Sequence, residues 1–297
     1  MNTCQPPRIA VRKPSFDVPA GACDCHTHII GPPDRYPFVP NRSFTPPDAS
    51  ERDILAMLAV LGLERMVIVQ PSVYGIDNRR TVDAVQTLGT DRARGVAMVA
   101  AEVETSELRD LDQAGIRATR FITTAGGGPS LDDLPGVARK IAELGWHIEM
   151  YVPLATLPQV LPVVRSLPVP VVFDHMGGLR ADTAENDPLL IEILRLLEAG
   201  RHWVKLCGYR NSLAGFPYGD VAPLAKRFIA AAPERCVWGT DWPHTVIEGH
   251  MPEDADLLDL LADWAPTPSV RDSILVDNPM TLYGFPMPRG RQQPAGG

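Results

Sequence analysis

The chain has 297 residues, of which 45% are hydrophobic and 22% charged, and its formal net charge is -8 at pH 7. This composition is that of an ordinary globular protein, long enough for one large domain or two smaller ones. The acidic balance argues against nucleic acid as a partner, and the absence of a long apolar run argues against a membrane-embedded chain.

The N-terminal residues and the cysteines indicate where the protein works. Residues 1–20 are rich in proline and basic residues and lack the apolar stretch of a signal peptide. The five cysteines are odd in number, and most fall in strand-like runs, as buried thiols do. We therefore expect a cytoplasmic protein in which residues 1–20 form a loosely held arm and residues 21–297 form one domain.

Eight apolar, strand-like runs alternate with helical patterns along the chain. The expected strands are a run ending at His28, then 66–70, 95–100, 117–122, 146–152, 169–174, 203–206 and 236–240. The expected helices are 48–62, 79–88, 106–114, one ending at Leu144, 157–166, 188–199, 221–231, 255–264 and 269–276. Eight such units predict an α/β fold, the single-domain (β/α)8 TIM barrel. The rival, an open doubly wound sheet, lacks its glycine-rich phosphate loop after the first strand.

Polar side chains gather where these strands end, which is where a TIM barrel places its reactive groups. His26 and His28 form an H-x-H pair, and residues two apart on a strand share a face. Such a pair serves either as metal ligands or as hydrogen-bond donors to a ligand. The other strand ends supply Gln70, Ser72, Tyr74, Arg117, Arg120, Tyr151, His175, Lys205, Tyr209, Arg210, Asp241 and His244.

Strict alternation along the strands also makes predictions about their neighbours. Cys23 and Cys25 are expected on the face opposite the two histidines, as packing residues. Asp174 precedes His175 and is expected to point away from it. Lys205 lies inside the seventh strand, where a role in the pocket and a buried ion pair are equally plausible.

Several motifs together resemble one known family. They are D-x-H-x-H at 24–28, V-I-V-Q-x-S at 67–72, R-x-x-R-F at 117–121, D-H-M-G at 174–177, W-G-T-D-W-P-H at 238–244 and N-P-M-x-L-Y at 278–283. The pattern resembles the amidohydrolase superfamily, in particular its branch of 2-pyrone-4,6-dicarboxylate lactonase-like hydrolases. The resemblance runs over nearly the whole chain after residue 20 and implies a TIM-barrel enzyme.

Many members of this superfamily hold divalent metal ions, but the chain departs from their ligand pattern at two positions. Arg120 stands where a Lys or Glu ligand is expected, and an arginine cannot lose its proton to bind metal. Tyr151 stands where a histidine is expected, and a phenol with a pKa near ~10 is a poor ligand at neutral pH. The branch is implied to work without metal, so we expect no cofactor. In the alternative, a single zinc ion would be held by His26, His28, His175 and Asp241.

The resemblance implies a hydrolase that opens a small, carboxylate-bearing lactone. Asp241 is expected to accept a proton from the attacking water, while three imidazoles donate hydrogen bonds to the ring carbonyl: His26, His28 and His175. Two guanidinium groups, Arg120 and Arg210, are expected to bind the carboxylate. The remaining substrate-binding candidates are neutral: Ser72, Tyr74, Tyr151 and His244.

The substrate is expected to differ from the pyrone dicarboxylate itself. The resemblance implies further arginines after the fourth strand and after D-H-M-G, but this chain has glycines at 126–128 and at Gly178. Arg180, two residues further on, is a candidate replacement. We therefore expect a lactone with one carboxylate or with the hydroxyl pattern of a sugar acid.

Other functions and states stay open. A lactone isomerase of the same branch would use similar groups, and a zinc-dependent amidohydrolase or decarboxylase would use the metal-binding alternative. The sequence neither requires nor excludes a homo-oligomer. Neither nucleic acid nor a membrane is expected as a partner.

Overall fold

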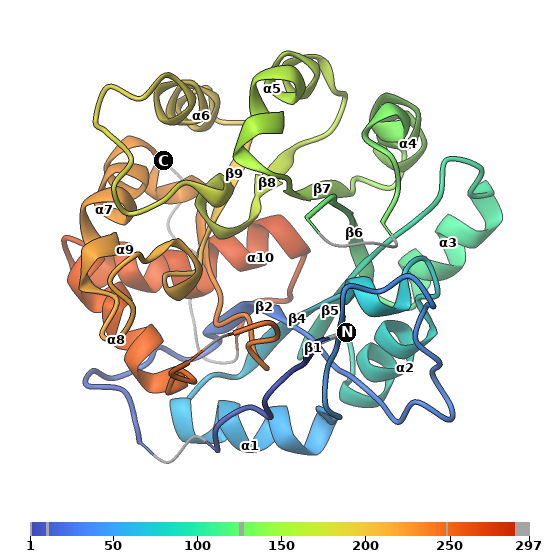
Figure 1. Cartoon of the computed structure of the whole chain (residues 1–297), viewed down its shortest axis with the longest axis horizontal. Coiled ribbons are helices and arrows are strands. Elements are labelled where there is room, and N and C mark those ends of the chain that lie inside the picture. The colour runs from blue at the N-terminus through green and yellow to red at the C-terminus, as the bar shows by residue number, and fades with distance from the viewer. Residues whose placement is uncertain (1, 10–11, 125–127, 248, 289–297) are drawn as a thin grey trace.

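The computed structural model describes residues 2–9, 12–124, 128–247 and 249–288. Eight parallel strands lie side by side in the order β10-β9-β8-β7-β6-β5-β4-β2, and helices surround them (Figure 1). These strands are β2 (Cys23–Thr27), β4 (Arg65–Val69), β5 (Ala93–Ala97), β6 (Ile116–Ile122), β7 (His147–Tyr151), β8 (Val171–Phe173), β9 (Trp203–Leu206) and β10 (Cys236–Trp238). The predicted (β/α)8 TIM barrel is confirmed.

The helices follow the strands in the expected order. They are α1 (Glu51–Leu61), α2 (Arg79–Leu88), α3 (Thr105–Gln113), α4 (Leu134–Ala142), α5 (Leu157–Ser166), α6 (Pro188–Glu198), α7 (Ala222–Ala231), α8 (Asp254–Trp264), α9 (Pro268–Asp272) and α10 (Asn278–Tyr283). Helix α1 begins one residue after Ser50, whose hydroxyl accepts a hydrogen bond from Asp53 N, and ends at Gly62 with φ 76°.

The C-terminal helices differ from the prediction. The expected helix 269–276 is α-helical only as far as Asp272 and continues as a π-helical segment, Ser273–Asp277. Helix α10 then follows without a break. The π-helical segment buries Ile274, Leu275 and Val276. Sequence periodicity does not reveal it, because a single π-helical turn is too short to produce a periodic pattern of its own.

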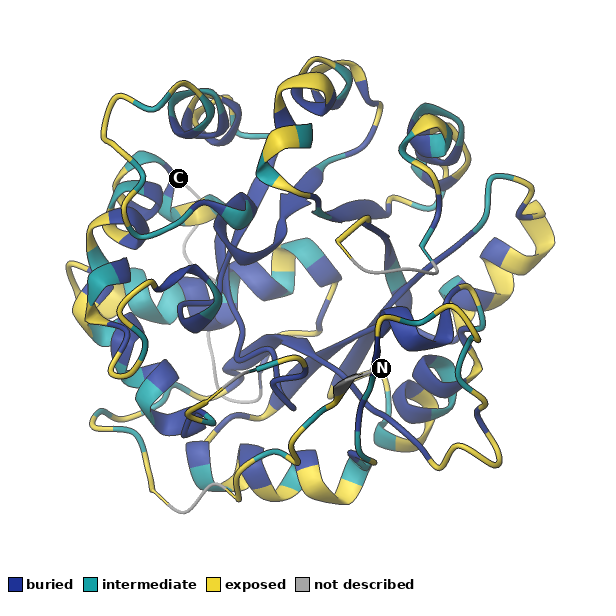
Figure 2. Ribbon diagram, viewed as in Figure 1, coloured by how far each residue is buried: buried dark blue, intermediate teal, exposed yellow. Residues whose placement is uncertain are grey.

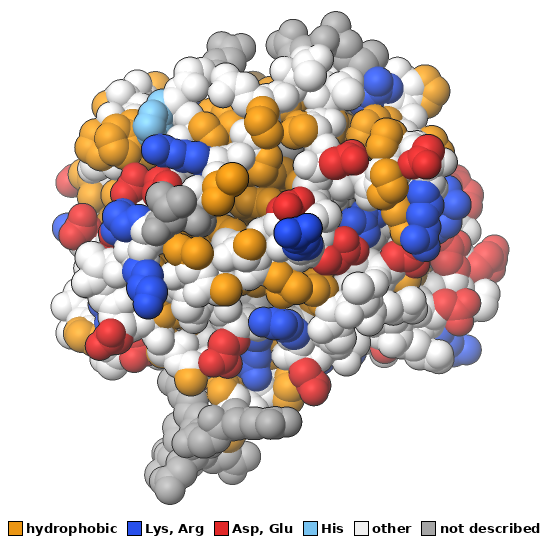
Figure 3. All heavy atoms as spheres, turned by 90° about the horizontal axis from the view of Figure 1, so that it is seen from below, with side chains coloured by type: hydrophobic (Ala, Val, Ile, Leu, Met, Phe, Trp, Pro, Cys, Tyr) orange, Lys and Arg blue, Asp and Glu red, His pale blue; other side chains and the backbone are white. Residues whose placement is uncertain are grey.

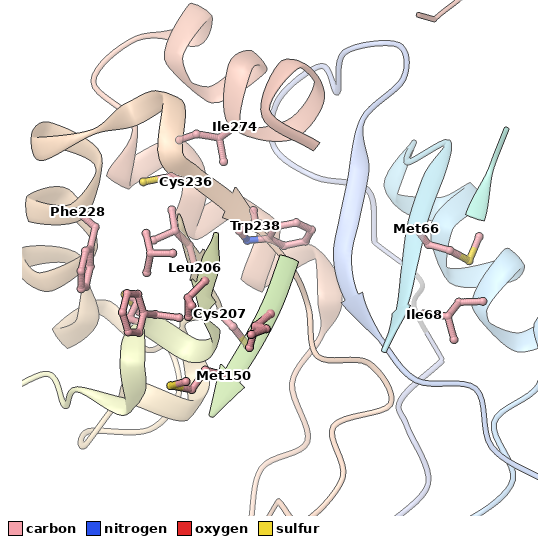
Figure 4. Packing of buried hydrophobic residues seen from close by; sticks show 14 of the residues in the cluster. Met66, Ile68, Met150, Leu206, Cys207, Phe228, Cys236, Trp238 and Ile274 are labelled. Atoms are coloured by element: carbon pink, nitrogen blue, oxygen red, sulfur yellow. The ribbon is translucent and has the colours of Figure 1, made fainter. Parts of the chain in front are cut away.

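The strands separate two apolar layers. Along β4, Met66 and Ile68 join the large layer beneath the helices, whereas Val67 and Val69 join a smaller cluster inside the barrel. Figure 2 shows buried residues along the strands and on the inner sides of the helices. Figure 4 shows part of the outer layer, including Leu206 of β9 and Phe228 of α7. Both faces of the sheet are therefore covered, which explains the continuous apolar runs.

The barrel closes where the first and last strands of the domain meet. Thr27 forms an isolated parallel bridge with Trp242. Asp241 N donates to His26 O at 2.8 Å, and His28 N donates to Trp242 O at 2.8 Å. The motifs at 24–28 and 238–244 are thus joined directly by backbone hydrogen bonds.

The predicted placement of Cys23 and Cys25 is wrong. Both pack inside the barrel, in the same cluster as Val67, Val172 and Val237. Between Asp24 and Thr27 the pairing of β2 with β4 changes register, so the strict alternation of faces breaks there. The cysteines are packing residues as expected, but on the inner side, below His26.

The amino-terminal end of the barrel, which we call the floor, is closed by the end of the domain. Tyr283 and Phe285 are buried there, in the inner cluster. Arg94 donates to Tyr283 O at 3.1 Å, and the guanidinium groups of Arg65 and Arg94 each lie 5.3 Å from the centre of the Phe285 ring. These contacts fix the C-terminal segment under the strands.

The N-terminal residues lie against the domain. Strand β1 (Asn2–Thr3) pairs in parallel with β3 (Phe44–Thr45). Arg12 forms ion pairs with Asp256 at 2.5 Å and with Asp259 at 2.8 Å. Acidic and basic side chains are interspersed on the face drawn in Figure 3. Among the described residues, no helix combines the length and the apolar character needed to cross a bilayer.

Candidate active site

The two histidines of the H-x-H pair lie at the carboxyl end of β2. Their rings meet edge to face with centres 5.1 Å apart. Gly239, on the neighbouring last strand, permits this approach, because a β carbon there would lie 2.7 Å from Cβ of His26. His26 is fully buried, whereas His28 is 5% exposed and faces a cavity.

Asp241 lies against both histidines. Its Oδ1 is 3.5 Å from His26 Nε2 and 3.3 Å from His28 Nε2. Its Oδ2 accepts hydrogen bonds from Tyr209 Oη, at 2.7 Å, and from Arg210 Nε. Burial alone would raise the pKa of Asp241, but the Arg210 guanidinium and the nearby imidazoles lower it well below its ordinary value. The carboxylate is therefore ionised in the resting protein.

His175 follows β8 in a turn of left-handed backbone. Its φ is 50°, and that of Met176 is 51°. This turn places the His175 ring with its centre 4.8 Å from that of His26 and 4.8 Å from that of Tyr151. Burial lowers the pKa of His175 well below its ordinary value, so the ring is neutral.

The same turn corrects the expectation for Asp174. Instead of pointing away, Asp174 Oδ1 lies 3.6 Å from His26 Nδ1. Because left-handed residues follow Asp174, the chain does not alternate faces as a strand does. Both Asp174 and His175 therefore approach His26, and the prediction that they diverge is wrong.

A buried group of charges lies beneath the histidines. Lys205 Nζ is 2.8 Å from Glu149 Oε1 and 3.1 Å from Asp174 Oδ1, and Arg120 Nε is 3.3 Å from Asp174 Oδ2. Burial alone would raise the pKa of Glu149, but the Lys205 ammonium lowers it to about 2. Of the two interpretations of Lys205, the structure supports the buried ion pair.

A cavity of about 170 Å³ opens above these groups. Seven of the predicted site residues line it: His28, Ser72, Arg120, Tyr151, His175, Arg210 and Asp241. His26 does not line it, because the ring is covered by its neighbours. The structure therefore places His26 behind Asp241 rather than at the cavity surface.

Two predicted pocket residues lie elsewhere, and that part of the prediction is wrong. Tyr74 is 1% exposed, and its hydroxyl accepts a hydrogen bond from Gly31 N at 2.7 Å. His244 is fully buried, with Nε2 3.0 Å from Asp254 Oδ1. Neither is among the residues that line the cavity. Each follows a strand end, but the local turn directs its side chain into the surrounding wall.

Arg180 does not replace the arginines that the chain lacks. Its guanidinium donates to Arg210 O and to Ser212 O, both at 2.9 Å, and it does not line the cavity. The glycines at 126 and 127 lie outside the described residues. Two guanidinium groups therefore face the cavity from the described part of the chain, those of Arg120 and Arg210.

Other residues at the cavity were not predicted. The long proline-rich loop contributes Ser43 and Phe44, and the segment after the last strand contributes Thr245 and Val246. Their positions depend on how loops fold over the barrel, which no motif in the sequence encodes. Tyr209 was also missed as a partner of Asp241, although it directly precedes Arg210.

Several His, Asp and Cys side chains of the site lie close enough together to bind a metal ion. Three groups have ligand atoms within 4.8 Å of one another: His26 with Asp174 and His175, His26 with His28 and Asp241, and His175 with Cys207 and Asp241. However, Lys205 Nζ lies 3.1 Å from His26 Nδ1, and Arg120 Nη2 lies 3.5 Å from His26 Nε2. Since both cations are donors only, they compete with a metal ion for His26, which therefore fits a metal poorly.

Known proteins resemble the whole chain. It is 40% identical to a 2-pyrone-4,6-dicarboxylate hydrolase of Comamonas testosteroni, over 91% of this chain and 92% of that protein. It is 39% identical to a 4-sulfomuconolactone hydrolase of Rhizobium radiobacter, over 95% and 96%. A D-galactarolactone isomerase of Agrobacterium fabrum is 31% identical, over 91% and 92%.

Solved structures and the family profile agree with these relatives. A crystal structure from Agrobacterium tumefaciens superimposes with a TM-score of 0.86 at 30% identity, covering 94% of this chain and 99% of the other. The sequence profile of the amidohydrolase family matches residues 23–285. This range contains β2 to β10 and every residue of the site, and the chain therefore belongs to the amidohydrolase family.

Proposed function

We propose that the protein hydrolyses a carboxylate-bearing lactone with a water molecule activated by Asp241. The observation that carries this proposal is the position of Asp241, whose carboxylate contacts two imidazoles in the wall of a cavity that two arginines also line. The names of the relatives, two lactone hydrolases among them, support the same reaction class.

The proposed reaction proceeds in two steps. Water attacks the ring carbonyl, Asp241 takes a proton from that water, and a C–O bond forms to give a tetrahedral oxyanion. His175 lines the cavity and stabilises this oxyanion with its N–H group, and His28 lines the same cavity. The ring C–O bond then breaks, and the leaving oxygen takes the proton back from Asp241. The product is the open-chain acid.

Arg120 and Arg210 are the proposed carboxylate-binding residues. Each is paired with an acidic residue in the resting site, Arg120 with Asp174 and Arg210 with Asp241. A guanidinium has five N–H donors, so it can bind a substrate carboxylate while keeping one of these contacts. Ser72 and Tyr151 add hydroxyl groups to the same wall. This set suits a single carboxylate better than two.

We further propose that the reaction needs no metal ion. Three cationic groups, of which Arg120 and Lys205 are buried and Arg210 is half-buried, already balance three carboxylates at the site, those of Glu149, Asp174 and Asp241. Adding a divalent cation would leave two uncompensated positive charges in a buried site, which is costly. The His175 imidazole supplies a hydrogen bond where a metal would otherwise polarise the carbonyl.

The cysteines support the proposed cytoplasmic location. All five lie in the described part of the chain, and none forms a disulfide. Cys23, Cys25, Cys207 and Cys236 are buried, and Cys4 is half-buried. Reduced, buried thiols of this kind are usual in cytosolic proteins.

A panel of lactones tests the proposal. The wild-type protein is incubated with mono- and dicarboxylate lactones, and proton release is followed with a pH indicator. Asp241→Asn, which keeps the size of the side chain, should lower kcat by about 100- to 10000-fold because the general base is lost. An Asn variant with full activity would contradict the assignment of Asp241.

Lactone isomerase activity is a second candidate, supported by the 31% identical isomerase. An isomerase converts one lactone into another and releases no net acid. With an isomerase the pH indicator should therefore record no net proton release, and NMR of the products would show a new lactone. Elemental analysis of the purified protein separates both from a zinc enzyme, which requires stoichiometric metal and loses activity with a chelator.

A further inference from the structure

Lys205 lies directly beneath His26, and the proposed chemistry leaves it without a task. Its side chain is fully buried, and three acceptor atoms surround its ammonium group. They are Glu149 Oε1 at 2.8 Å, Asp174 Oδ1 at 3.1 Å and His26 Nδ1 at 3.1 Å. An ammonium has three N–H donors and no acceptor, so each of its donors has one partner here.

This contact decides which ring nitrogen of His26 carries the proton. Because Lys205 donates to Nδ1, that nitrogen must be the acceptor, and the proton of the neutral ring lies on Nε2. Nε2 faces Asp241 Oδ1 at 3.5 Å, which can accept from it. Burial and the Lys205 ammonium lower the pKa of His26 well below its ordinary value, which agrees with a neutral ring.

The opposite tautomer makes longer contacts. It would point an N–H group at the ammonium and a lone pair at the Asp241 carboxylate. Its favourable contacts would be with Arg120 Nη2, 3.5 Å from Nε2, and with Asp174 Oδ1, 3.6 Å from Nδ1, and both are longer than the contact of Lys205 with Nδ1. The Nε2–H form of His26 satisfies both Lys205 and Asp241.

His28 is held the other way round. Its Nδ1 lies 2.7 Å from Val69 O, and a backbone carbonyl only accepts, so Nδ1 carries a proton. Both histidines of the H-x-H pair therefore turn Nε2 to Asp241, but the proton lies on Nε2 in His26 and on Nδ1 in His28. A pair that binds one metal ion through both Nε2 atoms would need both rings protonated on Nδ1.

We propose that Lys205 is a positioning residue that fixes His26 as the Nε2–H tautomer, so that His26 orients the Asp241 base and cannot serve as a metal ligand. This inference deepens the proposed function and rests on it for the role of Asp241. Lys205 acts through His26 and does not line the cavity. The ion pairs with Glu149 and Asp174 hold the ammonium in place for this purpose.

The first test reads the tautomer in the resting wild-type protein. Long-range ¹⁵N–¹H correlation NMR distinguishes the protonated from the unprotonated ring nitrogen, and the signals of His26 are identified by their loss in His26→Gln. We expect Nε2 protonated and Nδ1 unprotonated. The reverse assignment, an equal mixture or an imidazolium would overturn the proposal.

The second test changes the ammonium. Lys205→Met keeps the length of the side chain but removes the donor, and the matched control Tyr283→Phe removes the hydrogen bond to Glu149 Oε1 without touching His26. We expect Lys205→Met to lose the tautomer preference and to lower kcat by about 10- to 100-fold at unchanged KM, the size of effect seen for supporting partners of site histidines. Tyr283→Phe should keep both. A control that shifts the tautomer as much as Lys205→Met, or a Lys205→Met variant that keeps it, would overturn the proposal.

Zinc binding gives a readout that needs no substrate. With the ammonium gone, His26 can adopt the Nδ1–H form, so Lys205→Met should bind Zn²⁺ about 10- to 100-fold more tightly than wild type in a competition titration. An unchanged zinc affinity would contradict the exclusion of metal by Lys205. Both this titration and the tautomer measurement are independent of the lactone panel, so a failure of the proposed function remains distinguishable from a failure of this inference.

Discussion

The two ends of the barrel are made by the same strands but differ in how they treat their polar groups. At the floor, Arg94 donates to the carbonyls of Tyr283 and Gly284, and aromatic rings cover the guanidinium groups. At the carboxyl-terminal rim, buried atoms such as His175 Nδ1 have no hydrogen-bond partner. The floor guanidinium groups hold the C-terminal segment, although Arg65 Nη1 has no partner, whereas polar groups of the rim line the cavity.

The backbone shows the same difference. Among the described residues, the non-glycine residues with positive φ are His175, Met176, Tyr218, Asp241, His244 and Val246. All six follow β8, β9 or β10, on the rim side. Such backbone conformations are sparsely populated because they cost free energy. They persist where the surrounding structure holds a side chain in a required direction. The floor contacts therefore serve stability, whereas the strained backbone of the rim serves to direct side chains.

The largest expected effect is at the floor. Phe285→Ala removes a ring that is 5% exposed and lies under two guanidinium groups, and it should lower the free energy of unfolding by about 3–5 kcal/mol. Urea denaturation followed by circular dichroism measures this loss. The kcat of the folded fraction should equal that of wild type. A selective loss of kcat would show that the two ends are not separate.

The next largest effect is expected at the rim, where a substitution should lower kcat and leave the stability unchanged. His175→Asn keeps a residue that tolerates positive φ but removes the imidazole, so kcat should fall by about 100- to 1000-fold. The midpoint of urea denaturation should stay close to that of wild type. Steady-state kinetics with the best lactone of the panel, beside the denaturation curve, checks both. An active but unstable variant would place His175 with the floor residues.

Arg210 links the base to the proposed substrate. Arg210→Met should raise KM for a carboxylate lactone by about 10- to 100-fold, because a charge-assisted hydrogen bond is lost. Asp241 works as a base only when ionised, and Arg210 holds its pKa well below the ordinary value. Without that cation the pKa of Asp241 rises, so the acid limb of the kcat/KM profile should move to higher pH.

A matched arginine provides the control for this shift. Arg180→Met removes a guanidinium that binds backbone carbonyls outside the cavity. The acid limb of this variant should coincide with that of wild type. If both variants moved it equally, the shift would come from general charge and not from the contact with Asp241.

The smallest effect tests the corrected placement of Tyr74. Tyr74→Phe leaves the buried Gly31 N–H without its acceptor and should lower the free energy of unfolding by about 1–3 kcal/mol. KM and kcat should not change, because the hydroxyl does not reach the cavity. A raised KM would return Tyr74 to the substrate-binding set.

Much of the fold could be predicted because its signals are local. Apolar runs with intervening helical patterns gave the eight units, and three motifs marked His26, His28, His175 and Asp241, whose ring or carboxylate atoms the structure brings together. The grouping of these four side chains followed from the rule that the parallel strands of a barrel end at one rim. The directions of the individual side chains were not needed for this prediction.

The rest could not be predicted because it depends on irregular backbone and on contacts across strands. The register change in β2 and the left-handed turn after β8 break alternation, so the directions of Cys25 and Asp174 were wrongly predicted. The contact of Lys205 with Glu149 joins β9 to β7, and only the register of the barrel brings them together. Loops such as that carrying Phe44 have no periodic signal.

The seam between β2 and β10 has a consequence for renaturation. Because His26 and Asp241 come from opposite ends of the chain, the base acquires its neighbours only when the cylinder of strands closes. Contacts between distant parts of a chain are the slowest to form. Turnover should therefore return after helical circular dichroism when denaturant is diluted, and a fragment that ends before the last strand can be folded in part yet inert.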